Sequence, residues 1–143
     1  MTERTFSIIN PDAVAAGHAG EILAALEQAG FNVLGIRMLR MRKEQAQEFY
    51  AVHRGKGFYE SLVTFMTDGP VIVLALERED AIAKLREVMG ATNPANAAEG
   101  TIRKRFAANI ERNAIHGSDA PATAETELRF FFSTADLLQM GSA

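Results

Sequence analysis

The sequence predicts an α/β fold, because short apolar runs typical of strands alternate along it with segments of helical periodicity. The clearest strand covers residues 71–76, where every side chain is apolar and a turn at residues 67–70 precedes it. Such a run suits a strand covered on both faces, so it is expected at the centre of a sheet. The clearest helix covers residues 19–29, with Ile22, Leu23 and Leu26 on one face and Gly30 at its end.

The other elements follow from the same patterns. Strands are expected at residues 6–9 and 31–41 and in the short apolar run before Gly117, and helices at residues 43–52, 58–66, 79–89 and from Pro121 toward Phe131. Residues 10–12 are expected to end the first strand, and residues 91–100 to form a loop. Acidic residues in the first turn of helix 79–89 suit the helix dipole. This order predicts a ferredoxin-like βαββαβ sandwich with an antiparallel four-stranded sheet and extra helices.

Length and composition indicate a single domain spanning residues 1–143. The chain is 48% hydrophobic and 23% charged, ordinary values for a globular protein. It has no cysteine, which excludes disulfides and thiolate metal sites. Its net charge of −3 argues against a general binder of nucleic acid or anionic membranes. A polar N-terminus and the lack of a long apolar run predict a cytoplasmic protein. The tail, residues 134–143, is expected to be loosely ordered or to pack on a neighbouring subunit.

Two familiar kinds of site are excluded by spacing. The pair Gly55-Lys56 lacks the upstream glycine and the following hydroxyl of a phosphate-binding P-loop, and no strand precedes it. The histidines His18, His53 and His116 are isolated in sequence, so none has zinc-ligand spacing. The protein is therefore not expected to hold a metal by itself, and a divalent ion is expected to arrive with a phosphate ligand.

The segment from Asn113 to Asp119 holds the strongest catalytic candidate. His116 lies in a short apolar run that glycine closes, ahead of residues that begin helices. Imidazole is a good nucleophile at neutral pH, and a strand that ends in this way presents it at the mouth of a cleft. The alternative is a structural histidine with its hydrogen bonds satisfied.

Other side chains are candidates for binding an anionic ligand. Arg86 and the run Arg103-Lys104-Arg105 supply guanidinium groups that grip phosphate, although such charges are commonly only solvated. Thr92 and Asn113 add neutral donors in flanking loops. Phe58 follows a glycine-rich loop and either stacks on a base or packs into the core.

Taken together, these segments resemble the nucleoside diphosphate kinase family over nearly the whole chain. The matching segments, with their first and last residues, are Glu3–Thr5, Pro11–Val14, Phe49–His53, Gly69–Val71, Met89–Pro94, Gly100–Arg103 and Asn113–Asp119. The resemblance implies transfer of the γ-phosphate of a nucleoside triphosphate to a nucleoside diphosphate through a phosphohistidine at His116, in a ping-pong cycle.

The resemblance also implies roles for the surrounding residues. It assigns nucleotide binding to Phe58, Arg86, Thr92, Arg103 and Asn113, with Phe58 stacked on the base and Mg²⁺ bridging phosphate oxygens. It makes Glu127 the partner of the second ring nitrogen of His116, where the alternative is an exposed helix residue. Tyr50 and Ser118 match positions that support the same pocket, and Ser118 is otherwise a residue at the start of a helix.

The chain departs from the family pattern at two places. Asn10 stands where the family usually has lysine, which removes a formal charge near the transferring phosphoryl group unless Lys56 replaces it. Loss of one such electrostatic donor typically costs about 10²–10³ in rate. The loop Gly55-Lys56-Gly57 stands where many relatives have glutamate, arginine and proline, which predicts weaker or more mobile base stacking.

Two classes of function compete on these observations. The leading prediction is an enzyme, a nucleoside diphosphate kinase weakened by Asn10. The alternative is a catalytically impaired module that binds nucleotides and regulates a partner, since fold alone does not separate the two. Passing phosphate to other proteins is a third, weaker possibility. The resemblance also implies a homo-oligomer, a tetramer or hexamer, with no membrane and no specific nucleic acid as partner.

Overall fold

The computed structural model describes residues 2–137 of the chain and contains one four-stranded antiparallel sheet. The strands are β1 (Thr2–Ile9), β2 (Asn32–Leu39), β3 (Val71–Glu79) and β4 (Ile115–Gly117), in the sheet order β2-β3-β1-β4. This order confirms the predicted ferredoxin-like sandwich and puts the apolar run of β3 inside the sheet.

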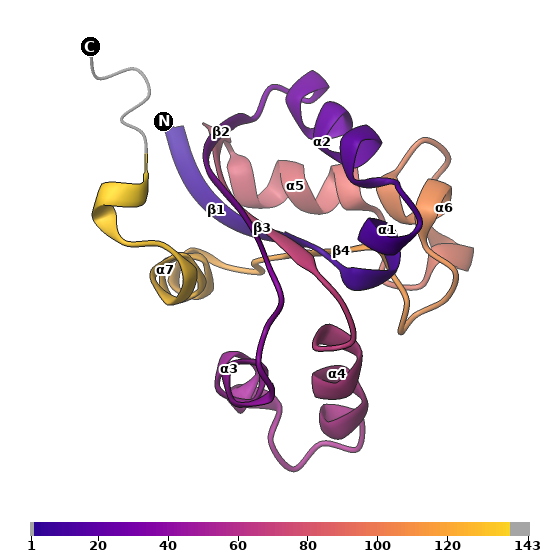
Figure 1. Ribbon diagram of the computed structural model, residues 1–143. Coiled ribbons are helices and arrows are strands. Elements are labelled where there is room, and N and C mark those ends of the chain that lie inside the picture. The colour runs from indigo at the N-terminus through magenta and orange to yellow at the C-terminus, as the bar shows by residue number, and fades with distance from the viewer. Residues whose placement is uncertain (1, 138–143) are drawn as a thin grey trace.

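Helices cover both faces of this sheet (Figure 1). The α-helices are α1 (Pro11–Ala15), α2 (Ala19–Gln28), α3 (Lys43–Phe49), α4 (Tyr59–Met66), α5 (Ala81–Met89), α6 (Ile102–Phe106) and α7 (Pro121–Phe131), and the 3₁₀ turns are η1 (Ala51–His53), η2 (Pro94–Asn96) and η3 (Thr134–Asp136). Helices α2 and α5 lie on one side of the sheet, and α3, α4 and α7 lie on the other (Figure 1). None of the helices in the described part of the chain is long and apolar enough to cross a membrane.

The alternation of side chains along β3 explains why the sheet is covered twice. Val71, Val73 and Ala75 are buried in the cluster that includes residues of α3, α4 and α7. Ile72 and Leu74 belong to the second cluster, with residues of α2 and α5. Since successive side chains of a strand point to opposite faces, an apolar run on β3 supports both layers.

Two short helices were missed by the sequence prediction. Helix α1 begins at Pro11, where the strand was expected only to end, because proline is well suited to the first helical position. Helix α6 begins inside the segment after the loop, where the Thr101 side chain accepts a hydrogen bond from the Lys104 backbone N–H. Both helices border the site described below.

Two predicted boundaries were also wrong. Strand β3 extends to Glu79, so the acidic residues precede α5 and do not lie in its first turn. Helix α3 ends at Phe49 and is followed by η1, where one helix had been expected to residue 52. In the tail, η3 leads to Leu137, which packs close to Gly35 of β2, while residues 138–143 lie outside the described residues.

Candidate active site

The backbone before His116 is held in a tight, strained turn by the segment that begins α1. Ala114 has a positive φ of 73°, and the N–H of Ile115 donates to the carbonyl of Asn113 at 2.9 Å. The N–H of Asn10 donates to the Ala114 carbonyl at 2.8 Å, and Asp12 Oδ2 accepts from the Ala114 N–H at 3.2 Å. A non-glycine residue in this region costs about 1–3 kcal/mol and persists only where its surroundings impose it.

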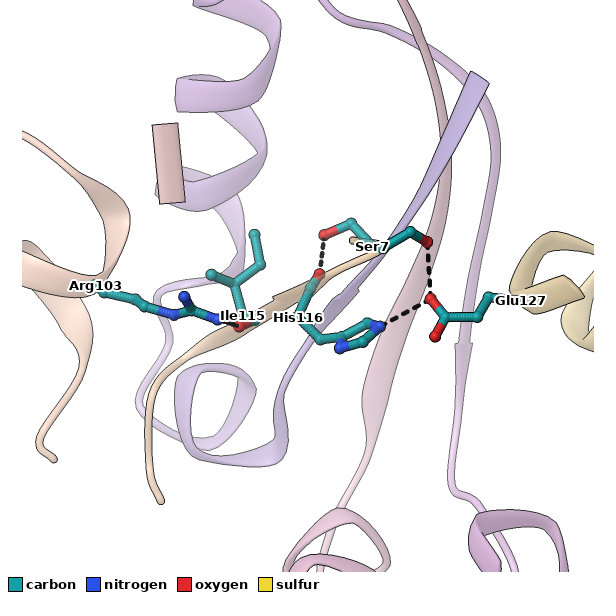
Figure 2. Close-up of polar contacts among 6 residues, drawn as sticks. Ser7, Arg103, Ile115, His116 and Glu127 are labelled. Carbon is teal, nitrogen blue, oxygen red and sulfur yellow. Dashed lines mark hydrogen bonds and ion pairs between the residues drawn. The ribbon is translucent and has the colours of Figure 1, made fainter. Parts of the chain in front are cut away.

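The imidazole of His116 is oriented by Glu127 of α7. Its Nε2 lies 2.9 Å from Glu127 Oε1, and the same oxygen accepts a hydrogen bond of 2.7 Å from Ser118 Oγ. The ring also packs edge-on against Phe6 and Phe49. Because Glu127 accepts the proton on Nε2, the lone pair of the neutral ring is on Nδ1, which faces away from the carboxylate (Figure 2).

The other contacts of β4 fix the same histidine through its backbone. Ser7 Oγ of β1 donates to the His116 carbonyl at 2.7 Å (Figure 2). Gly117 has no room for a side chain, because an added Cβ would come within 2.7 Å of Met89 and 2.8 Å of Leu85 on α5. Close packing of α5 against β4 therefore leaves little freedom for the histidine to move.

His116 opens onto a cleft of about 730 Å³ between α4, the loop after α6 and the end of β4. Of the residues predicted from the sequence, the cleft is lined by Tyr50, Phe58, Thr92, Arg103, Asn113, His116 and Glu127. The structure thus brings together seven of the nine predicted site residues, whose positions span more than half of the chain. The remaining two lie just behind the cleft or beside it.

Ser118 is one of these two residues, and its contact explains its position. It is fully buried and donates to Glu127, the carboxylate that orients the histidine. The alternative interpretation as a helix-start residue was wrong, since the residue that caps α7 is Ala120. Glu127 itself is not an exposed helix residue, because only 13% of its side chain is accessible.

Arg86 is the other residue, and it lines a smaller adjoining pocket of about 380 Å³. Thr92 and Arg103 line both this pocket and the main cleft, so the two spaces meet at these side chains. The arginine is exposed on α5. A ligand that extends from the main cleft past Thr92 therefore approaches Arg86.

Arg103 is a buried cation at the junction of the two pockets. Its guanidinium donates to the Gly90 carbonyl at 3.1 Å and to the Ile115 carbonyl at 2.8 Å, while its Nε is buried with no partner among the described residues (Figure 2). Burial, and next the charge of Arg86, lower the pKa of Arg103 to about 10. It remains charged at neutral pH, where two cations held close together favour an anionic ligand between them.

The three cations of the predicted basic run lie in different surroundings in the folded protein. Arg103 points inward, whereas Arg105 is exposed, pairs with Glu21 at 3.3 Å and lies over the Phe106 ring. Lys104 lines a separate surface hollow away from His116. Of the three adjacent cations, only Arg103 lines the cleft.

The far end of the cleft presents rings and apolar side chains to solvent. Phe58 is 49% exposed at the start of α4, so the alternative in which it packs into the core was wrong. Tyr50, by contrast, is buried, and this burial and next the charge of Glu127 raise its pKa, so its hydroxyl stays protonated. Lys56 lies 5.9 Å over the Phe58 ring and 3.5 Å from His53 Nδ1, outside the cleft lining.

Several lining residues were missed by the sequence analysis. Ile110 is 54% exposed and lines the same cleft as Phe58. His53 lies 5.2 Å from the Phe58 ring, and burial and then the charge of Lys56 lower its pKa. The side chains of Asn10 and Asn113 are paired by a hydrogen bond of 3.1 Å. Ile110 and His53 lie in the cleft because folding places their loops there, which no local sequence pattern indicates. Asn10 could be singled out from the sequence, because it stands where the family usually has lysine.

The acidic and histidine side chains offer little to a metal ion. Among residues 2–137, no group of three or more histidine, aspartate or glutamate side chains is placed to hold one. Glu127 is already engaged by two donors, and Asp12 accepts from the Ala114 N–H, although burial raises the pKa of Asp12. A divalent ion at this cleft would thus need oxygen ligands from a bound phosphate.

Comparison with known proteins points to one family over nearly the whole chain. The family model described as nucleoside diphosphate kinase matches residues 3–137. A nucleoside diphosphate kinase of Nitrosococcus oceani is 58% identical over 137 residues, 96% of each chain. The solved structure of the Aquifex aeolicus nucleoside diphosphate kinase superposes with a TM-score of 0.95 at 42% identity, covering 96% of this chain and all of that one. A halophilic nucleoside diphosphate kinase from Halobacterium salinarum, solved in complex with CDP, gives 0.93 at 39% identity, covering 96% and 92% of the two chains.

Proposed function

Because the chain belongs to the nucleoside diphosphate kinase family, and is accordingly a phosphotransferase acting on nucleoside di- and triphosphates, we propose that His116 carries the transferred phosphoryl group. One observation carries this proposal: Glu127 engages Nε2 at 2.9 Å, which leaves Nδ1 as the nucleophilic nitrogen in the cleft. The comparisons support the kinase and not the alternative of an impaired binding module.

The proposed chemistry uses each ring nitrogen for one task. The Nδ1 lone pair attacks the γ-phosphorus of a nucleoside triphosphate, and the bond from that phosphorus to the β–γ bridging oxygen breaks. The nucleoside diphosphate leaves with the electron pair. Glu127 keeps the proton on Nε2 and stabilises the positive charge that develops on the ring, as a carboxylate partner does for a reacting histidine. A second nucleoside diphosphate then attacks the phosphohistidine and restores His116.

The phosphate groups are proposed to lie between His116 and Arg86. Arg103 and Arg86 supply fixed positive charge there, while Thr92 and Asn113 donate neutral hydrogen bonds. We propose that Mg²⁺ enters with the nucleotide and supplies further charge neutralisation. The ion would be held by phosphate oxygens of the nucleotide.

The base is proposed to stack on Phe58, in the cleft that Ile110 also lines. Stacking uses the face of a ring, which every base has, so it tolerates different nucleotides. The relative from Halobacterium salinarum was solved with CDP, a nucleoside diphosphate, which supports a ligand of this class.

Asn10 is proposed to lower turnover relative to a lysine at the same position. Lys56 is not suited to replace the missing charge, since it lies over the Phe58 ring beside His53 and is not among the residues that line the cleft. The variant Asn10→Lys is therefore expected to raise kcat, by up to about 10²-fold if the charge acts on the transition state. Unchanged kcat in this variant would reject the idea.

We further propose a cytoplasmic homo-oligomer, a tetramer or hexamer. The edge strand β2 supports self-association, because Ile36 and Met38 on it are 51% and 63% exposed. Light scattering on the purified chain tests the number of subunits, and a monomer at micromolar concentration would contradict it.

The proposed nucleophile is tested with ATP labelled at the γ-phosphorus. Wild type is expected to take up label that is labile in acid and stable in alkali, and to lose it when GDP is added. His116→Ala is expected to take up none, while His18→Ala, whose histidine packs against Phe106 away from the cleft, is expected to label normally. Label that persists in His116→Ala, or that is stable in acid, contradicts the proposal.

A further inference from the structure

Asn10 is a buried polar residue that contacts a second amide in the cleft. Only 4% of it is exposed, and its Nδ2 donates a hydrogen bond of 3.1 Å to Asn113 Oδ1. Both residues line the cleft that holds His116. The contact joins positions 103 residues apart in the sequence. It links the side chain of the residue before α1 to a side chain of the segment before β4.

The backbones that carry these two amides are fixed independently of the side chains. The N–H of Asn10 donates to the Ala114 carbonyl at 2.8 Å, and the carbonyl of Asn113 accepts from the Ile115 N–H at 2.9 Å. Asp12 holds the Ala114 N–H at 3.2 Å. With both backbones anchored, the side chain of Asn113 moves only by rotation about χ1 and χ2, and the hydrogen bond from Asn10 restricts both rotations.

That rotation decides which chemical group Asn113 offers to a ligand. An asparagine amide has one oxygen, which only accepts, and one nitrogen, which only donates. When Oδ1 is held by Asn10, the NH₂ group is left out of that contact, on a residue that lines the same cleft as Thr92, Arg103 and His116. The opposite rotation would present an acceptor to the cleft, and an acceptor repels phosphate and other anionic oxygens.

We propose that Asn10 is a positioning residue that sets the amide of Asn113 with its NH₂ toward the cleft, as a donor to an oxygen of the bound nucleotide. This inference rests on the proposed function. Asn10 contributes only its donor to the pair, because its own Oδ1 is buried with no partner among residues 2–137. A lysine, which has three donors and no acceptor, would hold Asn113 in the same orientation. The substitution thus removes a charge and keeps the orienting hydrogen bond.

A double-mutant cycle tests the inference through nucleotide affinity. Asn10→Leu keeps the shape of the side chain and cannot donate, and Asn113→Ala removes the amide that is positioned. Each is expected to weaken ADP binding by about 3- to 10-fold, the range for one neutral hydrogen bond. Because Asn10 acts through Asn113, the double variant is expected to bind within about twofold of Asn113→Ala alone. Asn10→Lys is expected to bind ADP at least as tightly as wild type. Calorimetry at one salt concentration provides the measurement.

The controls separate positioning from folding and from the proposed function. Asn32→Leu makes the same substitution at an exposed position at the start of β2, outside the cleft, and is expected to bind ADP as wild type does. Thermal unfolding without ligand shows whether Asn10→Leu is folded, and Asn10→Ala, which also cannot donate, takes its place in the cycle if it is not. Equal ADP affinity in wild type and Asn10→Leu, independent effects that multiply in the double variant, or weak binding by Asn10→Lys would each overturn the inference. If wild type forms no phosphohistidine with ATP, the proposed function fails instead.

Discussion

The end of the cleft that holds His116 and the end that holds Phe58 differ in what fixes their side chains. At the first end, Ser7, Asp12, Glu127 and Arg103 make hydrogen bonds to residues 114–116, all from other parts of the chain. At the second end, Phe58 and Ile110 are each about half exposed and lie next to loops. Reacting atoms need fixed geometry, whereas stacking tolerates a range of positions. In the proposed function, the cleft is therefore rigid where the phosphoryl group is transferred and open where the base stacks.

Arg103 tests the rigid end and has the largest expected effect. Arg103→Met is expected to lower kcat by about 10²–10³, because one fixed donor to the developing phosphate charge is lost. It is also expected to lower the free energy of unfolding by about 1–3 kcal/mol, since the carbonyls of Gly90 and Ile115 lose their partner. Single-turnover transfer from ATP and urea unfolding measure the two effects.

The control for this variant lies in the same helix. Arg105→Met removes an exposed cation that pairs with Glu21 at 3.3 Å, and it is expected to change neither quantity appreciably. If Arg103→Met and Arg105→Met lower kcat by similar factors, general electrostatic attraction explains the result and the rigid end has no special role.

Phe58 tests the open end, where a smaller effect confined to binding is expected. Phe58→Ala removes the ring and is expected to raise KM by about 5- to 150-fold, the range for one stacked base, with kcat little changed. Phe58→Tyr keeps the stacking face and is expected to behave as wild type. A fall in kcat as large as the rise in KM would show that the base end also positions the reacting phosphate.

The strength of local sequence patterns explains how much of the fold could be predicted. The ferredoxin-like sandwich could be predicted because β3 and the longer helices carry strong hydrophobic patterns, and the structure confirms it. Helices α1 and α6 are only five residues long and were missed, since so short a segment has no periodicity to detect. Acidic residues before α5 were misplaced because Asp80 turns the chain with a φ of 55°, which no local pattern revealed.

The site shows the same limit from a different cause. The His116 segment was readable because nucleophile, turn and helix start are adjacent in sequence. The pairing of Asn10 with Asn113, and the place of Ile110 and His53 in the cleft, depend on segments brought together only by folding. The sequence also did not predict that Arg103 is buried while Lys104 and Arg105 are exposed, because this depends on how α6 packs. The assigned roles of all these residues remain predictions.

The loop before Phe58 gives the smallest predicted effect and a matched pair of variants. At both Gly55 and Gly57 an added Cβ would meet no atom within 4 Å, but Gly55 has a φ of +86° and Gly57 lies outside the left-handed region. Gly57→Ala is therefore expected to stabilise the protein by about 0.4–1 kcal/mol and to lower KM slightly, because the loop has less freedom to lose when the base stacks. Gly55→Ala is expected to destabilise it by about 1–2 kcal/mol, since alanine is strained at that φ. Thermal unfolding and KM for ADP measure both. Equal changes in the two variants would mean that backbone freedom does not limit the open end of the cleft.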